Sequence, residues 1–479
     1  METVTRRQFL TSAAAGVAVA PFMISGTKAA GNVIGANERI NVAVAGIHGQ
    51  GQSHIKALDA MPGVEVTYLI DPDSSLFSSR TELVKNNQSG PPRCVQDVRQ
   101  ALDDNELDAI SIATCNHWHS LITIWACQAG KDVYVEKPLS HNVVEGRRAV
   151  EAARKYQRIV QHGTQQRSSL ARAKEIAAVQ SGHYGKLRVS KGYCCKPRWG
   201  IGVKPVAAPP DHLDFNLWLG PARATPYHAN RVHYNWHWFW DTGNGDIGNQ
   251  GVHEMDVARW AIPGATLPRQ VWSLGGRFGY NDQAETPNTQ MTVFDYGESL
   301  LIFEVRGLVG NSSKDSRKVA NEYYLDDGMI TQGRFYPQGG GKAEPLIDAG
   351  GSVNGGNKFD NWISAVRSRD YHELNADVLE GHYSSALCHL ANTSYRLGER
   401  VPFDKKTYSF GDNPEVYATF NALERNLSYG VGLRMENLAY QLGRTLKFDA
   451  DREIYLGDRD ANNLLTRPPR EPFVVPEKV

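Results

Sequence analysis

The chain has 479 residues, and its 52 lysines and arginines balance 52 aspartates and glutamates, so the formal net charge is zero. A chain of this length predicts two or three domains. A balanced charge with no basic stripe or polybasic tail excludes a nucleic-acid-binding class, and six cysteines without a C-x-x-C pair exclude a disulfide framework and a zinc ribbon.

The first 30 residues have the pattern of an export signal. Arg6 and Arg7 precede an apolar run at residues 13–24, and small residues at 27–30 form an approximate cleavage site. This order is typical of a signal peptide, and the paired arginines favour the twin-arginine route. We expect residues 1–30 to direct the folded protein to the periplasm or beyond, with an N-terminal lipid-embedded anchor as the alternative.

Residues 39–71 have the order of a dinucleotide-binding unit. A strand runs into the glycine-rich run Gly46–Gly51, a helical pattern follows, and a second apolar run ends at Asp71. The glycines permit a tight turn against a pyrophosphate, and a carboxylate about 20 residues later can bind ribose hydroxyls and repel a 2′-phosphate. The pattern favours NAD over NADP, although His48 stands where the second glycine of the motif is expected.

Two further strands, predicted at residues 107–113 and 132–135, deliver polar side chains to one edge of the sheet. Ligands of open α/β sheets bind outside the carboxyl ends of the strands, so Lys137 is expected to face a bound ligand. A helix is predicted from 121 to 129 between the two strands. His117 and His119 have no cysteine or carboxylate cluster to complete a metal site, so we expect them to form hydrogen bonds and we expect no metal.

These motifs together resemble the Gfo/Idh/MocA family of sugar and inositol oxidoreductases. The similarity runs from about residue 40 to the end of the chain and is most specific in AGKDVYVEKPLSHN; Cys115 and His48 depart from the family pattern. The resemblance implies an α/β protein with a Rossmann domain followed by an α+β domain that has a large, mostly antiparallel open sheet. The cofactor-binding residues that it implies are Gly46, His48, Gly49, Gln50, Gly51, Asp71, Thr114, His117, His119, Glu136, Lys137 and Gln165.

A second cluster follows a glycine-rich loop in the later half of the chain. Asn249 and His253 lie four residues apart on one face of a predicted helix. An imidazole titrates near neutrality, so His253 suits proton transfer at a carbinol oxygen, although a histidine packed in the core has the same pattern. The resemblance places an aspartate at 249; an amide positions a hydroxyl but takes no proton, so catalysis is assigned to Lys137 and His253, with Asn249 positioning the substrate.

Three alternating tryptophans, Trp236, Trp238 and Trp240, would line one face of an extended chain. Such a face stacks on a sugar ring or belongs to the core, and both interpretations stay open. Arg167, in the crossover after the first domain, either contacts substrate or is a solvated linker residue. The predicted substrate contacts are Arg167, Trp238, Trp240, Asn249 and His253.

The rest of the chain predicts a sheet followed by helices. Alternating runs at 290–296 and 300–306 indicate antiparallel strands, residues 307–342 are predicted as surface loops, and helices are predicted at 359–366 and 378–395. The predicted parts are a Rossmann domain at 38–165, a substrate and oligomerisation domain at 166–466, and an extended arm at 467–479 that is available to wrap a partner subunit.

We therefore expect an exported oxidoreductase that transfers hydride between a sugar or polyol carbinol and a tightly held NAD, because free NAD is scarce outside the cytoplasm. A dimer or tetramer formed through the C-terminal sheet is expected. Two alternatives stay open. Transient oxidation followed by elimination would make the protein an NAD-dependent glycosidase, and Asn249 and His48 leave room for a non-catalytic sugar-binding relative.

Overall fold

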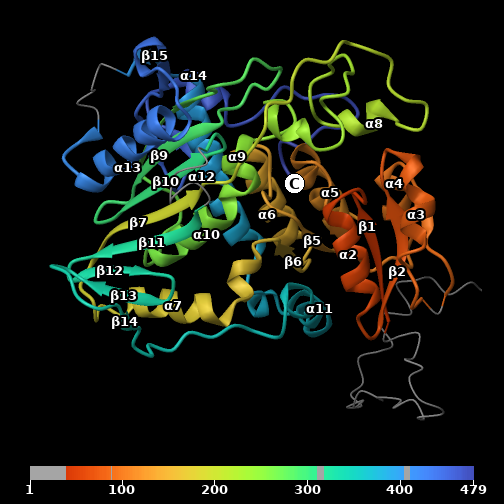
Figure 1. Cartoon of the computed structure of the whole chain (residues 1–479). Coiled ribbons are helices and arrows are strands. Elements are labelled where there is room, and N and C mark those ends of the chain that lie inside the picture. The colour runs from red at the N-terminus through yellow and green to blue at the C-terminus, as the bar shows by residue number, and fades with distance from the viewer. Residues whose placement is uncertain (1–38, 88, 310–317, 404–409) are drawn as a thin grey trace, which may run out of the picture. The chain divides into compact units, whose positions relative to one another are not determined.

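The computed structural model of the chain describes residues 39–87, 89–309, 318–403 and 410–479. The signal peptide expected at residues 1–30 lies outside the described residues. From Ile40 onward the chain forms one unit that contains two sheets (Figure 1). Within the described ranges, no helix has both the length and the apolar character needed to cross a membrane.

The first sheet has six parallel strands, as expected of a Rossmann domain. Every residue of β4 and β5 is buried, because helices cover both faces of a parallel sheet. The strands in sheet order are β3 (Arg93–Val95), β2 (Val64–Ile70), β1 (Ile40–Ala45), β4 (Ala109–Ile112), β5 (Asp132–Val135) and β6 (Val160–His162). The helices between them are α2 (Gln50–Asp59), α3 (Phe77–Thr81), α4 (Val98–Leu102), α5 (Asn116–Gln128) and α6 (Val143–Lys155).

The helix predicted at 121–129 begins five residues earlier, so His117 and His119 lie in the first turns of α5 and not in a loop after β4. Cys115 has extended backbone and occupies the N-cap position without a side-chain hydrogen bond to the helix. In the first turns of this helix, polar side chains are buried and form hydrogen bonds with backbone carbonyl groups. Because these buried side chains are polar, the sequence shows no apolar helical period there. Gly130, at a φ of +77°, ends the helix as expected.

The second sheet has twelve strands in the described part of the chain, and β7 (Leu187–Cys194) and β10 (Leu300–Arg306) are its parallel pair. The other neighbours are antiparallel, as expected. The remaining strands are β8 (Gln270–Gly276), β9 (Thr289–Asp295), β11 (Val319–Leu325), β12 (Gly328–Thr331), β13 (Arg334–Pro337), β14 (Glu344–Pro345), β15 (Glu399–Pro402), β16 (Ala439–Leu442), β17 (Leu446–Asp449) and β18 (Ile454–Tyr455).

Strands β11 to β13 correct the prediction that residues 307–342 form surface loops. β11 carries polar residues at buried positions, which weakens its apolar pattern. Two of these residues have partners inside the protein: Asn321 donates to the Glu254 carbonyl, and Glu322 accepts from Tyr193. A strand whose buried polar residues bond to distant parts of the chain therefore has the composition of a loop.

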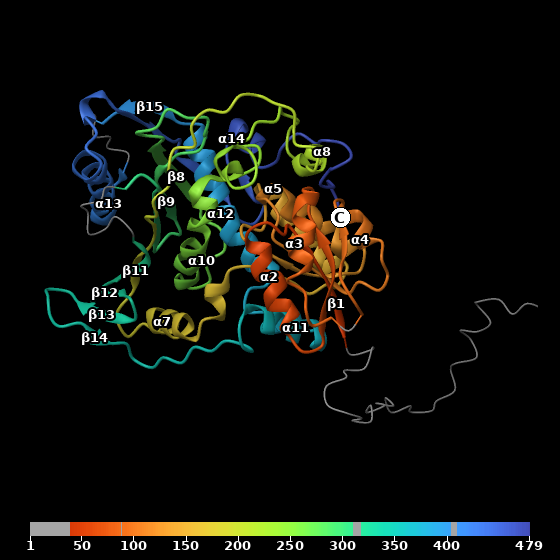
Figure 2. The same cartoon turned by 45° about the vertical axis from the view of Figure 1, so that its right-hand side comes forward.

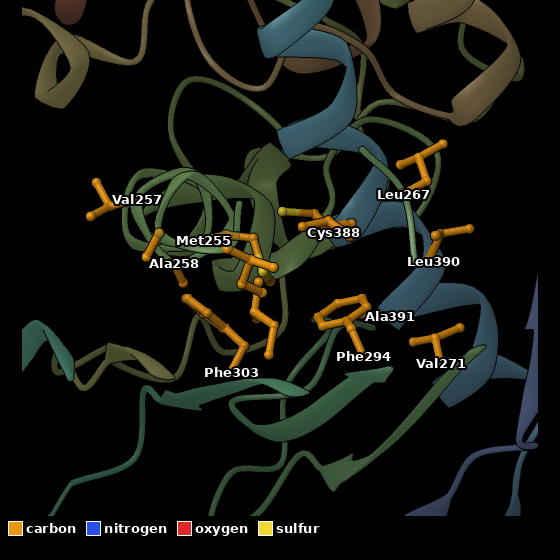
Figure 3. Packing of buried hydrophobic residues seen from close by; sticks show 14 of the residues in the cluster. Met255, Val257, Ala258, Leu267, Val271, Phe294, Phe303, Cys388, Leu390 and Ala391 are labelled. Atoms are coloured by element: carbon orange, nitrogen blue, oxygen red, sulfur yellow. The ribbon is translucent and has the colours of Figure 1, made fainter. Parts of the chain in front are cut away.

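Helices α10 (Gly251–Ala261) and α12 (Val378–Arg396) cover one face of the second sheet (Figure 1). Figure 3 shows Met255 of α10 and Cys388 of α12 packed with Phe294 and Phe303 of the strands. Because α10 is anchored in this core, the residues at its N-terminal end have a fixed position. The other helices of this part are α7 (Leu170–Gln180), α8 (Phe215–Leu219), α9 (Gly245–Asn249), α13 (Pro414–Arg425) and α14 (Arg459–Asn463).

The later chain also returns to the Rossmann sheet. Helix α11 (Lys358–Ser368) lies beside α2 in both Figure 1 and Figure 2, and its Phe359 and Trp362 pack in one cluster with Val42 and Tyr134. The nucleotide-binding half is therefore completed by residues far beyond the predicted boundary at 165.

The arm predicted at 467–479 packs in part on its own chain. Phe473 is buried, with its ring 5.4 Å from that of Trp118 on α5. Arg470 donates to the carbonyl of Gly220 at 2.6 Å. The apolar residues Phe473, Val475 and Val479 of this arm pack in one cluster with residues of α5.

Candidate active site

A cavity of about 480 Å³ lies at the carboxyl edge of the parallel sheet and is also lined by residues of the second domain. This position is where open α/β sheets bind their ligands. The predicted residues that line it are Gly46, His48, Gly49, Gln50, Asp71, Thr114, His119, Glu136, Lys137, Gln165, Asn249 and His253.

The turn from β1 into α2 requires its glycines. Gly46 has a φ of +79°, and a Cβ there would lie 2.5 Å from the backbone of Ala113 and Thr114 at the end of β4. A Cβ on Gly51 would lie 1.9 Å from the Gly46 carbonyl oxygen, so Gly51 serves the packing of helix against strand and does not line the cavity. The N-terminus of α2 thus opens onto the cavity, where its free amides suit a pyrophosphate.

Asp71 stands at the end of β2 and lines the same cavity. Its carboxylate accepts the N–H groups of Ile47 at 2.9 Å and Asp73 at 3.0 Å. Burial nevertheless raises the pKa of Asp71 to about 6, with the nearby Asp73 charge acting in the same direction. A carboxylate here is placed to accept hydrogen bonds from ribose hydroxyls.

Glu136 is held by an ammonium and an imidazole from two distant parts of the chain. Its Oε1 lies 3.2 Å from His54 Nε2 and 3.2 Å from Lys358 Nζ. Burial opposes ionisation, but the Lys358 ammonium and the His54 hydrogen bond hold the pKa of Glu136 well below its usual range. Lys358 belongs to α11 and gives no local signal of this role, so sequence reasoning missed it.

Lys137 and His253 face the same cavity from the two domains. Lys137 donates to the carbonyl of Asn249 at 2.9 Å, and burial lowers the pKa of its ammonium. His253 is buried with no hydrogen-bond partner for Nδ1 in the described part of the chain. Burial, assisted by the Lys137 charge, lowers the pKa of His253 to about 3. The cavity therefore offers an amine and a neutral imidazole.

Asn249 and His253 lie on two helices and not on one continuous helix as predicted. Helix α9 ends at Asn249 and α10 begins at Gly251. Both side chains still line the cavity. Among the described residues, the Asn249 amide nitrogen makes two long contacts, at 3.4 Å to both the Tyr234 hydroxyl and Asp246 Oδ1, so the amide remains available to orient a ligand hydroxyl.

Two of the three tryptophans are placed differently from the prediction, because residues 235–238 form a 3-10 helix and not an extended chain. Trp236 lines the cavity, while Trp238 packs against the Arg198 guanidinium and Trp240 against Arg396. The alternation of the three residues therefore does not place them on one face.

Arg167 and His117 also lie outside the cavity lining. Arg167 is buried, and its Nε lies 2.9 Å from both carboxylate oxygens of Asp256. A guanidinium committed to a buried ion pair is not free for substrate. The His117 ring lies between the Trp218 carbonyl oxygen, at 2.9 Å, and that of Thr242, at 3.2 Å, so it links the two domains.

Sequence reasoning missed the segment that follows β7 and the histidines of the aromatic run. Lys196, Arg198, His233, Tyr234 and His237 all line the cavity. The aromatic run was a signal for the last three of these residues, but Lys196 and Arg198 stand in a stretch without any motif. Only the second domain's docking against the parallel sheet brings them to the site.

Comparison with known proteins agrees with this geometry. Residues 40–164 match the family model described as the oxidoreductase family, NAD-binding Rossmann fold, and residues 177–271 match the oxidoreductase family's C-terminal alpha/beta domain. The chain is 30% identical over 156 residues to a scyllo-inositol 2-dehydrogenase (NAD(+)) of Bacillus subtilis, covering 32% of this chain and 44% of that protein.

Other relatives are named for a different activity. An alpha-N-acetylgalactosaminidase of Shewanella oneidensis is 26% identical over 177 residues, covering 33% of this chain and 39% of that protein. The matches therefore span less than half the length of these curated relatives. Among solved structures, the WlbA dehydrogenase from Bordetella pertussis in complex with NADH and UDP-GlcNAcA shares the fold with a TM-score of 0.54 at 17% identity, over 75% of this chain and 97% of that chain.

Proposed function

The chain belongs to the Gfo/Idh/MocA oxidoreductase family, and from this we propose that it transfers hydride between a carbinol carbon of a sugar or polyol and NAD. One observation supports the proposal above the others. A single cavity combines the glycine turn of an NAD-binding Rossmann domain with a buried amine, Lys137, and a neutral imidazole, His253. The first element holds a dinucleotide, and the other two supply proton transfer.

The residues present fit the cofactor. The tight approach of Gly46 to β4 leaves the turn and the N-terminus of α2 free for the pyrophosphate, and Asp71 is placed for the adenosine ribose. Glu136 and Lys137 line the same cavity, where the nicotinamide and the substrate would meet. When bound, NAD supplies the acceptor or donor of hydride.

Oxidation of a carbinol requires removal of its hydroxyl proton. Lys137 holds the oxygen through Nζ, and because burial lowers its pKa, the free amine that accepts this proton is more populated near neutral pH. His253 lines the cavity and is neutral, so its imidazole accepts a hydrogen bond from the substrate or shares the proton. The Asn249 amide orients the hydroxyl.

Nucleotide content and turnover test this function. The purified protein is expected to show nicotinamide absorbance without added cofactor. Members of a panel of sugars and inositols are expected to reduce the bound nicotinamide. Lys137→Met should lower the rate of reduction by at least about 100-fold, because a general base contributes about 10²–10⁴-fold. Lys186→Gln, at an exposed lysine paired with Glu298, is the matched control. Undiminished reduction by the Lys137 variant would refute the assignment.

The glycosidase alternative has its own support. Several relatives are described as glycosyl hydrolase family 109 proteins, and Asn249 replaces the carboxylate that a simple alcohol dehydrogenase of this family would carry. Transient oxidation of a sugar acidifies the neighbouring C–H and permits elimination of a glycosidic substituent before reduction. Release of aglycone from aryl glycosides without net NADH would establish this route, whereas stoichiometric NADH would support the dehydrogenase.

We also propose export by the twin-arginine route, on the strength of Arg6 and Arg7 before the apolar run. Cell fractionation tests it: Arg6→Lys with Arg7→Lys should retain the protein in the cytoplasm. Recovery of this double variant in the periplasm at the wild-type level would contradict the proposal.

A homo-oligomer formed through the C-terminal sheet is proposed as well, because the open sheet exposes edge strands such as β14 and β15. Analytical ultracentrifugation of the purified protein decides it. A monomer at micromolar concentration would contradict the proposal.

A further inference from the structure

The charges around the cavity do not balance at its substrate end, by which we mean the part lined by Lys137, Lys196, Arg198, Tyr234 and Asn249. Two cations follow β7 and line the cavity there, Lys196 and Arg198. Arg198 is neutralised, since its Nε and Nη2 lie 3.0 and 2.7 Å from the two carboxylate oxygens of Asp246. Lys358 is neutralised in the same way by Glu136. Neither Arg198 nor Lys358 therefore has charge left for a ligand.

Lys196 has no such partner. Its ammonium donates to the side-chain oxygen of Gln250 at 3.2 Å, a neutral amide, and no carboxylate pairs with it in the ranges that the structure describes. Glu254, on the next turn of α10, bonds Gln250 at 3.4 Å, and burial raises its pKa to about 7, so it supplies at most part of a negative charge.

The acids on the rest of the cavity wall lie elsewhere. Asp71 and Asp97 follow β2 and β3, on the opposite side of β1 from β5 and Lys137 in the order of the sheet. Asp97 is also paired with Arg99 at 2.6 Å. The substrate end therefore holds one uncompensated positive charge, on Lys196, because Lys137 serves as the amine at the reacting oxygen.

Tyr234 adds a directed donor beside these cations. Its hydroxyl oxygen accepts from Arg198 Nη1 at 3.1 Å and from Asn249 Nδ2 at 3.4 Å. The oxygen is the acceptor in both contacts, so the O–H proton is left to donate to a further acceptor. Tyr234 lines the cavity with Lys196, and both are connected to residues 249–250.

We propose, on the basis of the function above, that the substrate is a sugar acid whose carboxylate binds Lys196 and the Tyr234 hydroxyl while its carbinol faces Lys137. One uncompensated ammonium matches one negative charge, which favours a carboxylate over a phosphate dianion. A sulfate ester has the same single charge, so the experiment separates it from a carboxylate. Charge-assisted hydrogen bonds of this kind are about twice as strong as neutral ones.

Titration calorimetry on the NAD-containing protein tests the proposal with D-glucuronate, D-glucose and D-glucose 6-sulfate. Glucuronate should bind at least about tenfold more tightly than glucose, and added salt should weaken only its binding. Lys196→Gln should remove that advantage, Lys196→Arg should restore it, and affinity for glucose should stay the same in both variants. Lys196 is exposed, so these variants should fold. Lys186→Gln controls for loss of a distant surface charge.

Equal binding of glucose and glucuronate, or an unchanged preference in Lys196→Gln, would overturn the proposal. Tighter binding of the 6-sulfate than of glucuronate would overturn the carboxylate assignment. Nicotinamide reduction is measured in parallel and separates the two claims. Uronate-selective binding without reduction would reject the oxidoreductase function and support the anion site. Equal reduction by neutral sugars would support the oxidoreductase function and reject the anion site.

Discussion

Glu136 and Lys137 are neighbours in sequence but have opposite electrostatic surroundings. Glu136 is bound by Lys358 and His54, which keeps the carboxylate ionised. It therefore does not fully compensate Lys137, whose pKa burial lowers despite the adjacent carboxylate. A proton acceptor at the site depends on this division, because a lysine paired directly with its neighbour would stay charged.

Asp71 gives a pH dependence with a definite sign. Its pKa is raised from 3.8 to about 6 by burial, so without cofactor its stabilising contribution is present below pH 3.8 and is lost as pH rises through about 6. Ribose hydroxyls need an ionised acceptor, so NAD affinity should move the other way. In cofactor-stripped protein, affinity should fall with decreasing pH, by up to about tenfold per unit below the pKa of Asp71.

Fluorescence titration with NADH at several pH values measures this effect. Asp71→Asn should bind more weakly at neutral pH and lose the pH dependence, since an amide does not titrate in this range. A wild-type affinity that is flat across the window would show that Asp71 does not bind the ribose.

At the scale of single elements, the β1–α2 turn is the most constrained part of the nucleotide site. Gly46→Ala should destabilise the protein by about 2–4 kcal/mol, because it combines a positive φ with a backbone clash. Gly49→Ala is the matched control, since a Cβ at Gly49 meets nothing within 4 Å. Thermal unfolding of both variants checks the difference, and equal melting temperatures would contradict it.

The C-terminal arm is a second element with a testable role. Phe473→Ala should cost about 3 kcal/mol of stability, as for other buried phenylalanines, because the ring packs on Trp118 and Arg99. Lys478→Ala should be neutral. Urea unfolding measures both variants. Both variants should have the same oligomeric state, measured by sedimentation. Dissociation of the oligomer by Phe473→Ala would instead show that the arm contacts a partner subunit.

At the scale of the whole molecule, the second domain reaches across the nucleotide site. Residues 196–236 cross to the Rossmann domain, where the Ser74 amide donates to the His212 carbonyl at 2.9 Å. The His233 ring stacks on that of His48 at 4.3 Å and bonds Asp73 at 2.8 Å. His48, which departs from the glycine motif, thus contacts the other domain at the cavity wall.

This crossing predicts slow release of the cofactor. His233→Ala removes both the stack on His48 and the bond to Asp73, so NADH should dissociate several-fold faster while the fold is kept. His183→Ala, at an exposed histidine outside the cavity, is the control. Stopped-flow displacement of NADH measures the rates, and equal rates in both variants would show that the crossing segment does not retain the cofactor.

The Rossmann half could be predicted from the sequence because its signals are local. Continuous apolar strands, glycines at a tight turn and polar residues at strand ends each reflect the chemistry of a few adjacent residues. Asp71, Glu136 and Lys137 were found in this way, and each lines the cavity. The strands of the second sheet with clear alternation were found for the same reason, whereas β11 was missed because its buried polar residues have distant partners.

Only the tertiary structure decided which side chains complete the site. Arg167 is of a residue type that often contacts ligands, yet Asp256 binds it in the core. Lys196 stands in a stretch without a motif and still lines the cavity. The local chain determined the nucleotide fold and the position of Lys137, since both follow from backbone geometry within a few residues. Packing of the second domain determined the charge and shape of the substrate end, because these arise from residues far apart in sequence that meet only in the folded chain.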